Sequence, residues 1–195
     1  MCIRDSYDAA LAALQQGLAG EPHNSEVWLT TAYVKRRQGD LEEAVRILER
    51  DRALSPMDPN VAVALGETYG MLRRYDLAAE SFRRGIGLAP EDPYAYTELA
   101  QVRLRQGEVA AARQVLAGLP TVENAESDRL RFYTALLDHD AEGALAALDA
   151  APVPAFEAGA FYLPIPLLRG MVLRWQGETE QARAAFAVAA DTLQA

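Results

Sequence analysis

Few side chains in this sequence belong to the types that carry out covalent or metal chemistry. The 195 residues include one cysteine, Cys2, and two histidines, His23 and His139. One cysteine cannot form an internal disulfide, and these three residues cannot form a usual structural zinc site. No histidine neighbours a serine in a recognisable nucleophile turn, and the motif G-x-S-x-G is absent. We therefore expect a protein that is not an enzyme, with no catalytic residue, metal or cofactor.

Other polar groups have structural explanations. Lys35, the single lysine, lies on the exposed side of a predicted helix. Acidic pairs such as Glu42-Glu43 fall at predicted helix N-termini, where a negative side chain favours the positive end of the helix dipole. The segment Gly85-Ile86-Gly87 lies late in a predicted helix and is not followed by the G-K-[ST] of a phosphate-binding loop.

Charge and hydropathy limit the partners. The formal net charge of −9 argues against a nucleic-acid surface, which needs a basic stripe. No apolar run approaches the roughly 20 residues that span a bilayer, so we expect no membrane insertion. Residues 1–6 fit no later pattern and lack the apolar stretch of a signal peptide, so we interpret them as a non-native leader. A native N-terminus would then be missing, which leaves the localisation unknown and the cytoplasm as the default.

The main pattern is a repeat with a period of 34 residues. Prolines, alanines and short turn sequences recur at this offset. The positions are Pro22, Pro56 and Pro90; Ala10, Ala44, Ala78 and Ala112; and the turn pairs Gly39-Asp40, Arg73-Arg74 and Gly107-Glu108. Agreement at several positions over successive steps indicates an architecture built from one repeated unit.

Each period predicts two helices joined by a short turn. In residues 25–38 apolar side chains recur at helical spacing, and Gly39 supplies the backbone freedom that ends the helix. Asp40 can cap the next helix, and Pro56 closes the unit because proline cannot continue a helix interior. The predicted helices are 25–38, 41–54, 59–72, 75–88, 93–106, 109–117, 125–138, 141–150, 165–176 and 179–194. Between the helices that end at 150 and begin at 165, a proline-rich stretch predicts a longer connection.

Large and small side chains recur at fixed places within the first three complete periods. Residues 25–58 supply Trp28, Ala32, Gly39, Ala44 and Pro56; residues 59–92 supply Leu65, Gly66, Tyr69, Tyr75, Ala78, Phe82 and Pro90; residues 93–124 supply Tyr96, Leu99, Ala100, Gly107, Ala112 and Leu116. On these residues the chain resembles the tetratricopeptide repeat family. Asp51 and Gly85 depart from the family pattern, which prefers alanine at their position.

The resemblance implies an all-α fold, a right-handed superhelical solenoid of antiparallel helix pairs. It covers residues 7–195 as a single domain, with regular repeats in 7–122 and degenerate repeats in 123–195. Small residues let the two helices of a pair approach closely, so we expect Gly66 and Ala100 to face Ala78 and Ala112. Because the chain opens with a second helix and stops without a capping helix, we expect it to be a fragment of a longer bacterial protein.

The resemblance also implies a function, the binding of a protein or peptide in a concave groove lined by the first helix of each repeat. Carried over position by position, the expected groove residues are Leu29, Thr30, Tyr33, Arg36, Arg37, Asn60, Glu67, Met71, Tyr94, Thr97, Glu98, Gln101 and Arg105. Tyrosine, arginine and apolar side chains in such a groove suit an extended peptide or a helix.

Two alternatives remain open at this stage. The array could be a regulatory or docking arm of a larger enzyme or signalling protein whose catalytic domain is absent. It could also self-assemble, because Leu11, Leu14 and Leu18 would present an unpaired apolar face on the N-terminal helix. The sequence does not name the partner.

Overall fold

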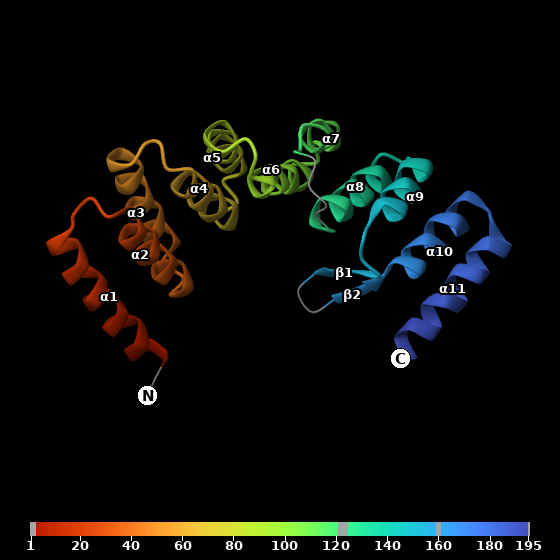
Figure 1. Cartoon of the computed structure of the whole chain (residues 1–195), viewed down its shortest axis with the longest axis horizontal. Helices are drawn as coiled ribbons and strands as arrows, with labels where there is room; N and C mark the ends of the chain where they lie inside the picture. Colours follow the sequence, from red (N-terminus) through yellow and green to blue (C-terminus); the bar gives the residue numbers. More distant parts are fainter. Residues whose placement is uncertain (1–2, 121–124, 159–160, 195) are drawn as a thin grey trace. The chain divides into compact units, whose positions relative to one another are not determined.

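The computed structural model describes residues 3–120, 125–158 and 161–194 and is almost entirely helical in these ranges (Figure 1). The helices are α1 Ile3–Gly20, α2 Ser25–Arg37, α3 Leu41–Leu54, α4 Pro59–Met71, α5 Tyr75–Leu88, α6 Pro93–Arg105, α7 Val109–Ala117, α8 Ala125–Leu137, α9 Ala141–Ala150, α10 Ile165–Gln176 and α11 Thr179–Gln194. Each helix predicted from residue 25 onward is present, with bounds that agree to within one residue. The predicted division between regular and degenerate repeats, at 122/123, lies outside the described residues.

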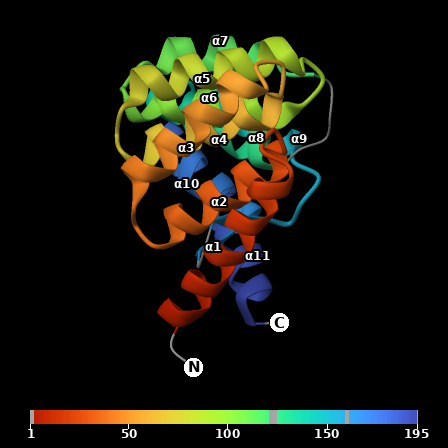
Figure 2. The ribbon, with the colours of Figure 1, turned by 90° about the vertical axis from the view of Figure 1, so that its left-hand side faces the viewer.

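The chain divides into two compact units, residues 1–102 and 103–195. In the first unit α2 packs against α3 and α4 packs against α5 as antiparallel pairs, and α3 also packs against α4 (Figure 1). Helix α1 runs beside α2 (Figure 2). It begins at Ile3, so part of the segment interpreted as a leader is helical.

Polar side chains cap the starts of α2, α3 and α4 in the first unit. Asn24 Oδ1 accepts from the Val27 N–H at 3.2 Å at the start of α2. The predicted cap Asp40 accepts from the Glu43 N–H at 3.4 Å, and Asp58 accepts from the Asn60 N–H at 2.9 Å. These bonds satisfy donors that have no partner inside the first turn of a helix.

The turn inside each helix pair uses one residue in the left-handed region of backbone conformation. These residues are Gly39 (φ 82°), Arg73 (φ 58°), Gly107 (φ 78°), His139 (φ 58°) and Gly177 (φ 87°). Glycine adopts this conformation without strain, whereas in other residues the Cβ atom comes too close to the backbone. The five residues mark the same place in five repeats, including the two with irregular spacing.

A glycine–phenylalanine contact closes the pair α4/α5. A Cβ placed on Gly66 would lie 2.6 Å from Cε1 of Phe82, which is 1% exposed. The expectation that Gly66 faces Ala78 is therefore incomplete, since a large ring covers this glycine. The same arrangement recurs in α10/α11, where a Cβ on Gly170 would lie 2.5 Å from Cε1 of Phe186.

The second unit contains the pairs α8/α9 and α10/α11, with a β-hairpin between α9 and α10 (Figure 1). Strand β1 (Ala155–Ala158) pairs antiparallel with β2 (Phe161–Pro164), and Phe156 lies opposite Leu163. The predicted longer connection between residues 150 and 165 is present, and it contains this hairpin, which the sequence did not predict. Phe156 is buried, and its ring centroid lies 6.3 Å from that of Phe132 on α8. This packing holds the hairpin in the core shared by α8, α9 and α10.

Candidate peptide-binding surface

The predicted groove residues of the first unit lie on α2, α4 and the first part of α6, the first helices of three successive repeats. Tyr33, Met71 and Tyr94 are the large side chains among them, and they are 40%, 52% and 45% exposed. Arg36 and Glu67 are half-buried beside them. We call these five residues the first-helix surface.

Glu67 links the three helices of this surface. Its Oε2 accepts from Arg36 Nη1 on α2 at 2.5 Å, and its Oε1 accepts from the Tyr94 hydroxyl on α6 at 2.6 Å. The Arg36 guanidinium also lies 5.3 Å from the centre of the Tyr33 ring, within the range of a cation–π contact. One carboxylate therefore holds side chains from both neighbouring repeats in fixed positions.

The electrostatics keep both tyrosines neutral. Burial raises the pKa of the Tyr94 phenol above its usual value, and the hydrogen bond to the Glu67 carboxylate raises it further. Burial and the Glu67 charge raise the pKa of Tyr33, while Arg36 opposes them. At physiological pH the two phenols are thus uncharged, and each presents a ring and one hydrogen-bonding oxygen.

Several predicted groove residues are used by the fold itself. Thr97 is buried, and its hydroxyl donates to the Tyr94 carbonyl at 2.8 Å. Thr30 is exposed but donates to the carbonyl of Glu26 on its own helix at 2.8 Å. Gln101 Nε2 donates to Glu98 Oε1 at 3.1 Å.

The remaining predicted groove positions are described by their exposure to solvent. Leu29 is half-buried, and Arg37 and Asn60 are exposed. Arg105 is exposed and belongs to the second unit, residues 103–195.

The second unit presents an apolar face that the sequence analysis did not assign. Leu137 on α8 and Met171 and Trp175 on α10 are each roughly half exposed. The Trp175 ring lies 5.9 Å from that of His139, the turn residue after α8. The turn residues could have identified two of these positions in the sequence. In the first unit, Arg37 and Met71 each lie two places before a left-handed turn residue. Leu137 and Trp175 lie two places before His139 and Gly177 in the same way.

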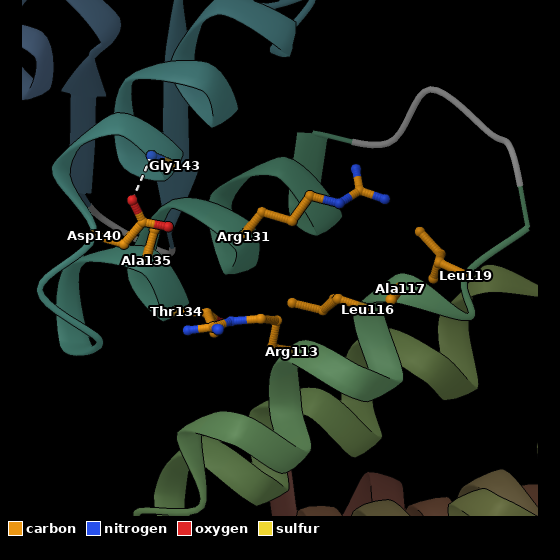
Figure 3. A pocket seen from close by; sticks show the side chains of 9 residues that line it. All are labelled: Arg113, Leu116, Ala117, Leu119, Arg131, Thr134, Ala135, Asp140 and Gly143. Atoms are coloured by element: carbon orange, nitrogen blue, oxygen red, sulfur yellow. Dashed lines mark hydrogen bonds between the residues drawn. The ribbon is translucent and has the colours of Figure 1, made fainter.

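A pocket of about 330 Å³ lies where α7 ends, between α7, α8 and the start of α9 (Figure 3). Helix α7 has nine residues, whereas the corresponding α3 and α5 have fourteen. The charged groups of this pocket have internal partners: Arg113 pairs with Asp138, Arg131 Nη1 lies 2.8 Å from Asp128 Oδ1, and Asp140 accepts from the Gly143 N–H at 2.8 Å. We therefore assign no ligand chemistry to it.

The described residues contain no group of three or more histidine, cysteine or acidic side chains arranged to hold a metal ion. Cys2 lies outside the described residues. Among the described helices, none has the length and apolar character needed to cross a membrane. Lys35 Nζ lies 4.0 Å from Asp40 Oδ2, a surface ion pair.

Comparison with known proteins decides the family. Two sequence models described as tetratricopeptide repeat match residues 4–66 and 63–128, which together span well over half of the chain. This chain belongs to the tetratricopeptide repeat family. The all-α solenoid fold that the family resemblance implied is thus confirmed, and tetratricopeptide repeats are protein-interaction scaffolds that are generally non-catalytic.

Solved tetratricopeptide repeat structures share this fold at low sequence identity. MamA residues 41–end from Desulfovibrio magneticus RS-1 is 19% identical with a TM-score of 0.70, covering 87% of this chain and 95% of that one. YrrB, titled a TPR protein with an unusual peptide-binding site, is 14% identical with a TM-score of 0.68, covering 92% and 91%. PilF of Pseudomonas aeruginosa is 23% identical with a TM-score of 0.58, covering 69% and 63%.

A curated relative is similar over part of the tetratricopeptide repeats. Cellulose synthase operon protein C of Xanthomonas axonopodis pv. citri (strain 306) is 32% identical over 119 residues. The match covers 58% of this chain and 7% of that protein, so the chain spans a small part of the relative's length.

Proposed function

We propose that the first-helix surface binds an extended segment of a partner protein. The observation that supports this most directly is the pair of exposed tyrosines, Tyr33 and Tyr94, on helices of different repeats. Tyrosine contributes strongly to protein interfaces because its ring offers a large contact area at low entropic cost, and its hydroxyl can still hydrogen-bond.

The Arg36–Glu67–Tyr94 contacts prepare this surface for binding. A side chain already held by hydrogen bonds loses less conformational entropy when a partner covers it. Tyr94 is fixed through its hydroxyl by Glu67, and Tyr33 is backed by the Arg36 guanidinium. Both rings are therefore available as fixed contacts, and Met71, four residues after Glu67 on α4, adds an exposed apolar side chain.

The proposal is tested with a phage library of random twelve-residue peptides, selected on the purified chain. Selected peptides are then synthesised, and their affinity is measured for the wild type and for the double variant Tyr33→Ala/Tyr94→Ala. We expect the double variant to bind at least tenfold more weakly, because it loses both exposed rings. Its far-ultraviolet circular dichroism and melting temperature should stay close to those of the wild type, since neither ring is in the core.

Leu77→Ala is the matched control, because Leu77 is also about 40% exposed but lies on α5, a second helix. Peptides bound at the first-helix surface should retain their affinity for this variant. Selected peptides that bind the double variant as tightly as the wild type would contradict the proposal, as would peptides that lose affinity only for Leu77→Ala.

A further inference from the structure

The junction between the first two complete repeats contains a buried carboxyl group. Asp51 on α3 has no exposed surface, and its Oδ1 has no hydrogen-bond partner among the residues that the structure describes. It stands at the repeat position where the family prefers alanine. A carboxylate buried without partners is costly, so the protonation state of this group needs an explanation.

The count of hydrogens around Asp51 gives that explanation. The Ser25 hydroxyl oxygen lies 3.0 Å from Asp51 Oδ2 and 2.9 Å from Asp58 Oδ2. A serine hydroxyl has one hydrogen and can donate to only one carboxylate. With both carboxyl groups ionised, one of these two short contacts would join oxygens that have no hydrogen between them.

The surroundings determine which carboxyl group holds the additional hydrogen. Asp58 is partly exposed and accepts from the Asn60 N–H at the start of α4, so a negative charge there is met by water and by a backbone donor. Asp51 is fully buried, and among the described residues Ser25 is the one donor to its carboxyl group.

The nearby cations of α3 are engaged elsewhere. The Arg50 guanidinium lies over the Trp28 ring at 4.9 Å, and Arg52 Nη2 lies 2.5 Å from Glu49 Oε2. On the two packed elements, the groups that face Asp51 are the Ser25 hydroxyl at the start of α2 and the Asp58 carboxylate before α4. A negative charge on Asp51 would therefore meet a second negative charge.

We propose that Asp51 keeps its proton in the folded chain at pH values where an exposed aspartate has lost it, and that this proton joins α2, α3 and α4. Asp51 Oδ2–H donates to the Ser25 oxygen, and the Ser25 hydrogen donates to Asp58 Oδ2. The unpartnered Oδ1 is then the carbonyl oxygen of a neutral acid, which is much less costly to bury than a charged oxygen. The contact between the two repeats thus depends on one titratable proton.

The direction of the pH effect follows from this arrangement. Burial raises the pKa of Asp51, and the Asp58 charge also raises it. A hydrogen donated by Ser25 to Asp51 would lower this pKa, but in the proposed arrangement Ser25 donates its one hydrogen to Asp58. The folded state then binds more protons than the unfolded state above about pH 4, the ordinary range for aspartate. Stability at this junction is therefore greatest in acid and falls as the pH rises through the folded pKa of Asp51.

The direct test is a carbon-13 NMR titration of the side-chain carboxyl carbons of the wild-type chain between pH 3 and pH 8. The Asp51 signal is assigned in the wild type through its bonded correlations to the backbone of residue 51. We expect the Asp51 midpoint to lie at least one pH unit above the ordinary aspartate value of about 3.9. An Asp51 midpoint at the ordinary value, or a high midpoint on Asp58 instead, would overturn the proposal.

A stability measurement distinguishes a protonated Asp51 from an Asp51 that is buried but holds no additional proton. Asparagine is the neutral isostere of protonated aspartate and can donate to Ser25. We expect the urea midpoint of the wild type to fall from pH 4 to pH 8, and we expect Asp51→Asn not to show this fall. The control Asp191→Asn, on the exposed end of α11, should keep the wild-type pH dependence. Equal pH dependence in wild type and Asp51→Asn would contradict the proposal, and if Asp51→Asn did not fold, the wild-type titration would decide.

Discussion

Gly66 on α4 lies directly beneath the ring of Phe82 on α5. A methyl group on Gly66 would approach three ring carbons to 2.6–2.8 Å, well inside van der Waals contact. The same glycine–phenylalanine relationship, sixteen residues apart, closes α10/α11 through Gly170 and Phe186. The close approach of two helices in this repeat therefore depends on the absence of a Cβ as much as on the presence of a ring.

Gly66→Ala should destabilise the chain by about 1–3 kcal/mol, because the buried ring cannot move away without disturbing its neighbours. The measurement is the urea midpoint followed by circular dichroism. Gly70→Ala is the control on the same helix, since apart from its chain neighbours and its own helix backbone no heavy atom of the described residues lies within 4 Å of the added methyl. It should be neutral or stabilising by about 0.5–1 kcal/mol through its better helix propensity. Equal changes in stability for the two variants would show that contact with Phe82 is not the reason why residue 66 must be glycine.

Arg73→Gly should stabilise the chain by about 0.5–1 kcal/mol. Arg73 has a φ of 58° at the turn where three other repeats have glycine, and glycine removes the steric penalty of this conformation. The comparison is Arg74→Gly, since Arg74 has a φ of −86° and donates to Glu42 at 2.7 and 3.1 Å. That variant should gain nothing and lose a surface ion pair. A melting temperature that falls for Arg73→Gly would mean that its side chain matters more than its backbone.

Phe156→Ala should weaken the second unit by about 3–5 kcal/mol, because it removes a buried ring that packs against Phe132. Hydrogen exchange read by mass spectrometry is the suitable measurement, since it reports each helix separately. Amides of α8, α9 and α10 should lose protection while those of α2 to α5 keep it. Tyr162→Ala, on the opposite strand and about half exposed, should have a small effect. Loss of protection spread evenly over the chain would contradict the localised role of the hairpin.

Stability should fall as the pH rises from about 10 to 12, and Tyr69 should contribute to this fall. Burial, followed by a hydrogen bond from its hydroxyl to Glu49 Oε1 at 2.8 Å, raises the pKa of Tyr69 from 10.0 to about 12. The folded state therefore holds a proton that the unfolded state loses near pH 10, and this contribution is complete below that pH. Urea midpoints measured between pH 9 and pH 11.5 should decline less steeply for Tyr69→Phe than for wild type. Parallel declines would exclude this role.

The helices could be predicted closely because their signals are local. Gly39 and Gly107 end first helices, Pro56 closes a repeat, and the 34-residue offset carries these signals through most of the chain. The predicted bounds differ from the observed ones by at most one residue, since the helices end at the same turn residues that the sequence displays. The hairpin at 155–164 was missed because its strands are four residues long and are stabilised by Phe132, a residue distant in sequence.

The candidate site was predictable in its positions but not in its interactions. Family positions identified Tyr33, Glu67 and Tyr94 as surface residues of first helices. They could not identify Glu67 as the acceptor for both Arg36 and Tyr94, because those bonds depend on how far successive repeats are offset. Thr97 was assigned to the groove by the same positions, although the structure buries it and uses its hydroxyl within α6.

The repeat, the helices and the family could be derived from the order of residues alone, since each follows from side-chain types at a fixed spacing. Packing in three dimensions sets which groups share a hydrogen, which glycine lies against a ring and which tyrosine is held by a neighbouring repeat. Those relationships join residues about 16 to 33 positions apart, such as Gly66 with Phe82 and Ser25 with Asp58. The spacing of side chains along a helix determines which residues share a face. The distance between the faces of two helices depends on how all the side chains between them pack.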